Sequence, residues 1–216
     1  MTSTAIGILL GLLVGLRHSF EPDHLTAVST LVGESHGLRG GALLGAVWGI
    51  GHTLALVAVG GVLLLVGASL PDRAGVVFEL CVAAMLIALG ARAIAVALRA
   101  APESEPLHAG HRAGPVSAWR PLAVGLVHGL AGSGALTAIV FADLPGTAAR
   151  LIYITLFGLG SIAGMAFASG AAGATLRVVA RSGGAQRGLG LATGALSIAV
   201  GALWAIPMWS RLCAAG

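Results

Sequence analysis

Lysine is absent from this chain of 216 residues, and all twelve of its basic residues are arginine. A P-loop needs its lysine to hold nucleotide phosphates, so the chain cannot by itself be a Walker-type ATPase. Charged residues make up only 9% of the sequence, against roughly 25% in a typical soluble domain. A soluble globular fold is therefore excluded. Nucleic-acid binding is excluded as well, because no basic patch interleaves with aromatic residues.

Paired cysteines and a metalloprotease motif are also missing. Cys81 and Cys213 lie far apart and form no Cys-x-x-Cys pair, so we interpret them as packing residues. A membrane thiol–disulfide carrier built from repeated halves would need such cysteines at matching positions. The chain has no His-Glu-x-x-His motif, which disfavours an intramembrane metalloprotease. We therefore expect a protein that is not an enzyme and has no resident cofactor.

Apolar residues dominate what is present: they make up 57% of the chain, and the mean hydropathy is +0.96. A membrane-spanning helix needs about 20 mainly apolar residues. Six segments reach this length, namely 4–33, 41–67, 75–99, 119–142, 149–176 and 187–210. The sequence therefore predicts an all-α integral membrane protein with six transmembrane helices in the lipid bilayer.

Arginines in the predicted connections are unevenly divided between the two sides of the membrane. The connections after the first, third and fifth segments hold Arg39, Arg99, Arg112, Arg120, Arg177, Arg181 and Arg187, against Arg73, Arg150 and Arg211 on the other side. The positive-inside rule then puts the first set in the cytoplasm and both termini outside. The composition, without lysine or asparagine, indicates a GC-rich bacterial genome and hence a bacterial inner membrane.

Four short stretches of the first half recur in the second half at a spacing of about 110 residues. They pair 15–18 with 125–128, 25–28 with 136–139, 48–52 with 157–161, and 86–91 with 197–202. A three-helix unit followed by itself crosses the membrane in opposite senses, so the matches predict a 3+3 inverted repeat with a central substrate site. The two halves are 1–100 and 119–216, joined by a cytoplasmic loop at 101–118. Composition bias in a chain rich in glycine, alanine and leucine is the alternative explanation.

Ionisable side chains interrupt the first apolar segment. His18, Glu21, Asp23 and His24 lie between two apolar runs, and charged groups at membrane depth are costly and rarely lack a function. Carboxylate oxygen combined with imidazole nitrogen suits a divalent transition-metal ion. Two carboxylates would neutralise a dication and neutral imidazoles would complete its shell, so we predict a metal site here.

Pro22 lies inside this cluster and predicts a break in the first helix. Proline has no N–H to donate to the carbonyl of His18, and it disfavours the helical conformation at Glu21. A break would let Asp23 turn toward the same cavity as the histidines and would leave the His18 carbonyl free as a further ligand. Pro22 would then open a second half-helix with Asp23 in its first turn, where the helix dipole favours a carboxylate.

Two further histidines lie in apolar segments. His52 follows glycines at 49 and 51, which permit a close approach to the first segment, and His128 lies where the repeat places the counterpart of His18. We predict His52 as a ligand and His128 as a ligand or part of the ion pathway. Weaker candidates are Ser133 and Thr137 along the path, and Glu34, His36, His108 and His111, which solvated loops explain more simply.

The spacing of these residues resembles that of the nickel/cobalt transporter superfamily (the NiCoT and NicO groups), and especially its compact six-span UreH-like members. That family carries His-x4-Asp-His in a transmembrane helix, matched here by His18, Asp23 and His24 with Glu21 as the extra acid. It also carries Gly-His-Ser/Thr in the next span, matched at 51–53. The resemblance implies transport of Ni²⁺ or Co²⁺, with metal-binding roles at His18, Asp23, His24 and His52.

A second hypothesis stays open alongside metal transport. A secondary transporter of a non-metal solute could use the same cluster as a proton relay. The acidic motifs that larger nickel permeases carry in later helices are absent here, which leaves the metal and the transport direction undecided. The expected partners are a divalent metal ion, a second copy of the chain, and metalloenzyme maturation proteins.

Overall fold

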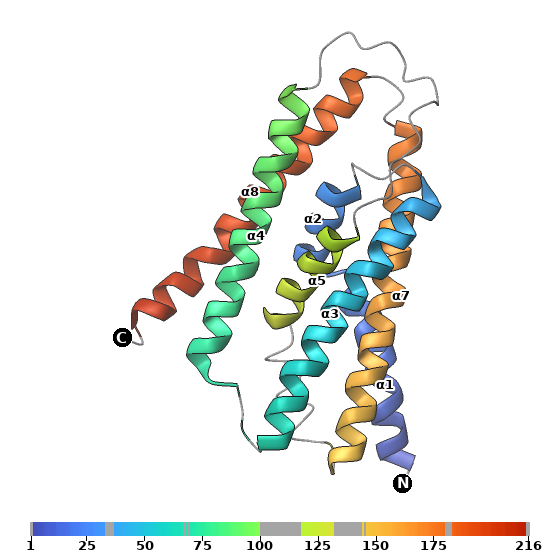
Figure 1. Ribbon diagram of the computed structural model, residues 1–216, viewed down its shortest axis with the longest axis vertical. Helices are drawn as coiled ribbons and strands as arrows, with labels where there is room; N and C mark the ends of the chain where they lie inside the picture. Colours follow the sequence, from blue (N-terminus) through green and yellow to red (C-terminus); the bar gives the residue numbers. More distant parts are fainter. Residues whose placement is uncertain are drawn as a thin grey trace.

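The computed structural model describes residues 2–32, 37–66, 68, 70–99, 118–131, 144, 146–179 and 183–214. Regular secondary structure in these ranges is entirely helical, with no strand among them. In chain order the helices are α1 (Thr2–His18), α2 (Pro22–Leu31), α3 (Leu38–Val66), α4 (Asp72–Arg99), α5 (Trp119–Ala131), α7 (Thr147–Val179) and α8 (Gly183–Ala214). The predicted all-α class is confirmed for this part of the chain (Figure 1).

Four of these helices are long and apolar enough to cross a membrane: α3, α4, α7 and α8. Their apolar lengths run from 26 residues in α3 to 32 residues in α7, more than the roughly 20 that a bilayer requires. They match four of the six segments expected from hydropathy. Several such helices in one chain make it a multi-pass membrane protein.

The first expected segment forms two helices in place of one. α1 ends at His18, and α2 begins at Pro22 after a turn through residues 19–21. Glu21, the N-cap of α2, has φ −64° and ψ 150°, the extended conformation favoured before proline. The helix break predicted near Pro22 is thus present.

The fourth expected segment, 119–142, begins with α5. This helix ends at Ala131, and the rest of the segment lies outside the described residues. The described residues also leave out almost all of the expected loop at 101–118. The six-span count, the 3+3 repeat and the division into 1–100, 101–118 and 119–216 therefore stay predictions.

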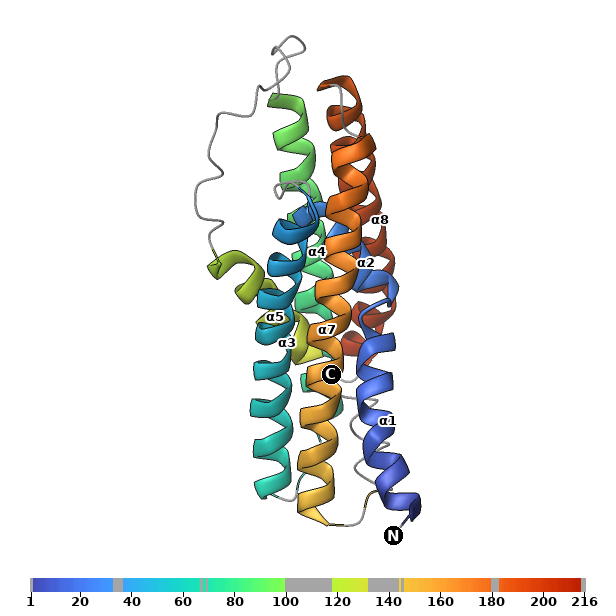
Figure 2. The same cartoon turned by 90° about the vertical axis from the view of Figure 1, so that its right-hand side faces the viewer.

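The helices pack in two groups. In the first group, α3 runs antiparallel to α7, α1 lies along α7, and α5 lies along α3; Figure 2 shows α3, α7 and α1 side by side. In the second group, α4 and α8 pack against each other on the other side of the molecule (Figure 1). The short helices α2 and α5 lie between α4 and α7 in this view.

Glycines let the helices of the first group touch backbone to backbone. A side-chain carbon at Gly15 of α1 would overlap the carbonyl oxygen of Phe157 in α7, and one at Gly125 of α5 would overlap the carbonyl oxygen of Trp48 in α3. In lipid, where apolar side chains gain little by meeting each other, small residues stabilise helix pairs by permitting this approach. These contacts hold α1 against α7 and α5 against α3, and so position the polar side chains those helices carry.

Candidate metal centre

Four helices bring five of the predicted site residues into one buried cluster. α1 provides His18, α2 provides Asp23 and His24, α3 provides His52, and α5 provides His128. Asp23 is 7% exposed and His18 is 2% exposed, while the other three are fully buried. Asp23 and His128 meet although 105 positions separate them in the sequence. The fold thus brings together histidines from three apolar segments that the sequence keeps apart.

The carboxylate of Asp23 is the charged centre of this cluster. Its Oδ1 lies 3.0 Å from Nδ1 of His24 and accepts the backbone N–H of His24 at 2.9 Å. Its Oδ2 lies 2.8 Å from Nε2 of His128. One carboxylate therefore joins two imidazoles from different helices, and these three side chains offer the oxygen and nitrogen donors that suit a divalent transition metal.

A second group of donor atoms, from His18, His24 and His52, adjoins the first. The ring centroids are 4.4 Å apart for His18 and His24, 5.2 Å for His18 and His52, and 5.4 Å for His24 and His52. One nitrogen from each ring lies within 4.8 Å of the others. Because zinc-type metal–nitrogen bonds are roughly 2.0–2.1 Å long, small ring rotations would let all three nitrogens hold one ion.

Several ring nitrogens of the cluster have no hydrogen-bond partner within the described part of the chain. They are both nitrogens of His18, Nε2 of His24, both nitrogens of His52 and Nδ1 of His128. Leaving a buried polar atom unpaired costs roughly 1–3 kcal/mol, and native proteins keep few such atoms without a function. These nitrogens are available to a ligand, which would offset that cost.

Glu21 lies at the edge of the cluster. Its side chain is 44% exposed, and its Oε2 lies 3.0 Å from Nδ1 of His18, although the orientation is not that of a hydrogen bond. Glu21 belongs to neither of the two groups of donor atoms. It therefore contacts the cluster through His18, on the side of the helix break.

The expectation that the break frees the His18 carbonyl is wrong. Pro22 cannot donate to that carbonyl, but the N–H of Glu21 reaches it at 3.0 Å. The N–H of Phe20 bonds the carbonyl of Arg17 in the same way, also at 3.0 Å. These short-range bonds tighten the end of α1 as a 3₁₀-type turn does, so the His18 carbonyl is already in use.

Comparison with known proteins finds a relative that matches most of the chain. The chain is 32% identical over 167 residues to the urease accessory protein UreH of Bacillus sp. (strain TB-90), a match that covers 73% of this chain and 72% of that relative. The chain belongs to the UreH family. No family model matches the chain, and no solved structure matches it. UreH kinship is consistent with the resemblance to nickel/cobalt transporters drawn from the His/Asp spacing.

Trp48 is one residue at the site of this UreH-family chain that the sequence motifs did not single out. Its indole stacks on His24, with ring centroids 5.5 Å apart and planes 27° apart, and lies 5.7 Å from the ring of His128. Trp48 is fully buried, and its Nε1 has no hydrogen-bond partner among the residues described. Trp48 lies one helical turn before His52, so the two side chains share one face of α3. This i, i+4 spacing is the sequence signal that could have identified Trp48.

The remaining candidates from the sequence cannot be placed in this UreH-family structure. Glu34, His36, His108, His111, Ser133 and Thr137 lie outside the described residues. Their expected roles in loops or along an ion path therefore stay predictions. Among the residues that the structure describes, the donor atoms of the site come from α1, α2, α3 and α5.

Proposed function

We propose that the protein transports a transition-metal dication, Ni²⁺ or Co²⁺, across a bacterial cell membrane through a site formed by His18, Asp23, His24, His52 and His128, with Glu21 at its edge. The observation that carries the proposal is a buried carboxylate surrounded by imidazoles in a bundle of apolar helices, where several ring nitrogens have no hydrogen-bond partner among the described residues. Ionisable groups in such surroundings mark ion pathways more often than structural contacts.

The chemistry of the donors favours a borderline transition metal over other ions. Imidazole nitrogen suits Ni²⁺, Co²⁺ and Zn²⁺, whereas Mg²⁺ and Ca²⁺ prefer oxygen ligands. The relative that matches this chain is an accessory protein of urease, and urease is a nickel enzyme, which favours Ni²⁺. The chain would supply the metal and take no part in catalysis.

The depth of the cluster fits a transport site. His52 is the central residue of α3 (Leu38–Val66), so the cluster lies midway along a membrane-spanning helix. In transporters built from repeats, the substrate site lies near the bilayer midplane at the interface between the two halves. Here Asp23 comes from the first half and His128 from the second.

Packing supports the proposal of six spans as a 3+3 inverted repeat. The contact of α1 with α7 has a counterpart in the contact of α5 with α3. The same correspondence holds for single residues, since Gly15 meets the Phe157 carbonyl and Gly125 meets the Trp48 carbonyl. These four positions are the ones that the sequence repeat pairs with one another.

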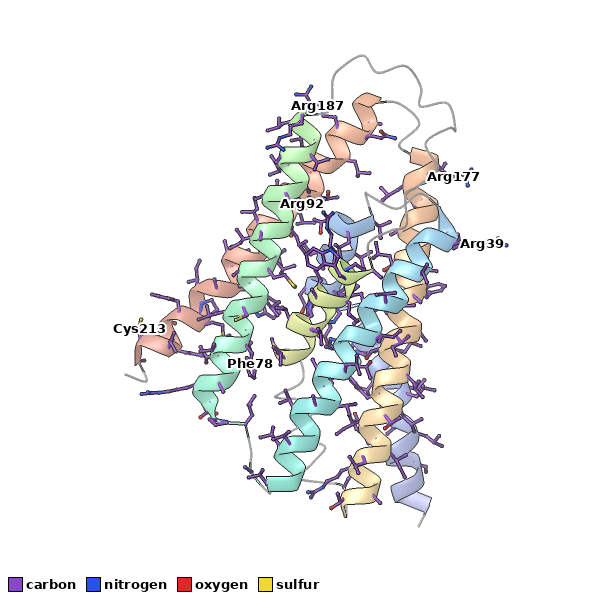
Figure 3. The ribbon with its side chains drawn as sticks, viewed as in Figure 1. Arg39, Phe78, Arg92, Arg177, Arg187 and Cys213 are labelled. Atoms are coloured by element: carbon purple, nitrogen blue, oxygen red, sulfur yellow. The ribbon has the colours of Figure 1, made fainter. Side chains whose placement is uncertain are left out.

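The proposed orientation has the arginine-rich side in the cytoplasm and both termini outside. Arg39, Arg177 and Arg187 lie in the upper half of the molecule (Figure 3), whereas the N-terminus lies at its lower end and the C-terminus a little below its middle (Figure 1). Phosphatase and fluorescent-protein fusions at each terminus test this orientation. Phosphatase activity at both ends is expected, and fluorescence at either end would contradict it.

Radiolabelled nickel and cobalt accumulation tests the function in cells that lack their own transporters for these metals. Asp23→Asn removes the charge of the site while keeping its shape, so it should abolish the change in accumulation that the wild-type protein causes. The matched control is Asp72→Asn, at the exposed start of α4, which should transport normally. Accumulation in the Asp23→Asn cells equal to wild type, with equal protein in the membrane, would refute the proposal.

Thermal unfolding of the purified protein separates metal transport from the proton-relay alternative. A ligand that binds only the folded state raises apparent stability as its concentration rises. Ni²⁺ or Co²⁺ should therefore raise the unfolding temperature of the wild-type protein, and Mg²⁺ should not. A temperature that does not respond to any transition metal would favour the relay.

A further inference from the structure

We infer that the cluster contains two ion-binding stations that share His24, and that a single ion passes from one station to the other. The three-histidine station consists of His18, His24 and His52, and the aspartate station consists of Asp23, His24 and His128. This inference rests on the proposed function, which treats these side chains as a single site and does not divide them into stations.

His24 lies between the rings of the two stations. Its ring centroid is 4.4 Å from that of His18 and 4.2 Å from that of His128. The centroids of His52 and His128 are 6.4 Å apart, farther from each other than either is from His24. His24 is the one residue that both stations contain, so an ion that changes station can keep it as a ligand.

The two nitrogens of His24 have different surroundings. Nδ1 lies 3.0 Å from the carboxylate of Asp23, whereas Nε2 has no hydrogen-bond partner in the described part of the chain. Nδ1 therefore belongs to the aspartate station and Nε2 to the three-histidine station. A neutral imidazole has one protonated nitrogen and one lone pair, so His24 can bind an ion in only one station at a time.

This restriction gives the transfer a defined chemistry. With the ion on Nε2, the proton is on Nδ1 and the N–H donates to Asp23. When the ion moves to Nδ1, the N–H bond at Nδ1 breaks and its proton passes to water, while Nε2 takes up a proton from water and forms the new N–H bond. The ring is neutral before and after the transfer, so the exchange releases no net proton.

Charge makes the stations unequal. The three-histidine station brings only neutral ligands, with the half-exposed carboxylate of Glu21 in contact with His18 at its edge, whereas Asp23 in the aspartate station directly neutralises half of the charge of a dication. In an interior of low dielectric constant this difference favours the aspartate station. The stations also use different helices, since α1 and α3 complete the first and α5 completes the second.

Co²⁺ is the probe for this arrangement, because its visible absorption reports the ligands around it. Equilibrium dialysis of the full-length purified protein measures how many Co²⁺ ions bind per chain. His52→Gln disables the three-histidine station, His128→Gln disables the aspartate station, and His24→Gln disables both. Ser197→Ala is the control, since Ser197 is buried and bonds the Leu86 carbonyl away from the cluster.

The expected stoichiometry is one Co²⁺ for the wild-type protein, the control, His52→Gln and His128→Gln, and none for His24→Gln. The two single-station variants should bind Co²⁺ with different absorption spectra and should both lose transport. Asp23→Asn should give a spectrum like that of His128→Gln, which separates loss of the station from misfolding. Size-exclusion chromatography checks that each variant is folded.

Each contrary result overturns a definite part of the reasoning. Two Co²⁺ ions per wild-type chain would show that both stations are occupied at the same time. Loss of binding in both folded single-station variants would show that the residues of both stations form one coordination shell around a single ion. Transport by either variant, or binding by His24→Gln, would also overturn the shared ligand. A wild-type protein that binds neither Co²⁺ nor Ni²⁺ would refute the proposed function and this inference with it.

Discussion

Gly125 sets how closely α5 approaches α3, and Gly125→Ala measures whether that approach holds the candidate metal centre together. The added carbon would lie 2.8 Å from the backbone nitrogen of His52 and would overlap the carbonyl oxygen of Trp48. Ordinary contact begins at 3.4 Å, so α5 would have to withdraw by the difference, roughly 0.6 Å, at the nitrogen alone. Such a shift would carry His128 away from Asp23.

Two effects of this substitution on stability oppose each other. Alanine in place of glycine favours a helix by about 1 kcal/mol, whereas an extra carbon in a packed interface costs about 1–3 kcal/mol. The obstructing atoms belong to the backbone and cannot rotate away as a side chain can. The clash therefore lies toward the upper end of its range and prevails, with a net loss of up to about 2 kcal/mol. The 2.8 Å contact between Nε2 of His128 and Oδ2 of Asp23 would lengthen past hydrogen-bond range.

Thermal unfolding in detergent and nickel accumulation in cells measure the two consequences. The control is Gly61→Ala in α3, where an added carbon would meet nothing within 4 Å. The control should be as stable as wild type or more stable, with normal transport, whereas Gly125→Ala should unfold at a lower temperature and transport less. If both variants behaved alike, the backbone contact would not be what positions His128.

Three further predictions follow from single contacts. Gly15→Ala should destabilise the protein about as much as Gly125→Ala, since it meets the Phe157 carbonyl in the same way; unchanged unfolding would contradict the correspondence between the halves. Glu21→Gln should slow transport severalfold yet leave Co²⁺ stoichiometry unchanged, because Glu21 belongs to neither donor group; loss of bound Co²⁺ in dialysis would make it a ligand. In a variant whose only tryptophan is Trp48, Co²⁺ or Ni²⁺ should quench the fluorescence, because the indole stacks 5.5 Å from His24; undiminished emission on titration would place the ion elsewhere.

Local chemistry made much of the site predictable from the sequence. Pro22 lacks an N–H and restricts the residue before it, so the break in the helix and the placement of Asp23 in the first turn of α2 followed directly. His128 could be singled out because the repeat places it opposite His18. Its contact with Asp23, by contrast, depends on a long-range approach of α5 to α3 that no local pattern encodes.

Other features depend on contacts that a one-dimensional pattern does not contain. Pro22 has no N–H to donate to the His18 carbonyl, which predicts a free carbonyl. The N–H of Glu21 donates to that carbonyl instead. Glu21 has the same spacing signal as a ligand, but the turn that leads into α2 leaves its side chain half-exposed. In the sequence Trp48 resembles any apolar core residue, and only the structure shows its ring stacked on His24. The four long helices were predictable from hydropathy alone, since length and apolar content decide whether a helix can span lipid.

The backbone contacts made by glycines have a mechanical consequence. Helices that meet through carbonyl oxygens and glycines cannot slide past each other without lifting apart, so α1, α3, α5 and α7 behave as one slab. α4 and α8, which meet in the same way at Gly90 and Gly201, form a second stiff unit. The main contacts between the two units run through α2 and α5, the short helices that carry Asp23, His24 and His128. A rocking motion of one unit against the other would therefore displace these three candidate metal-binding residues first.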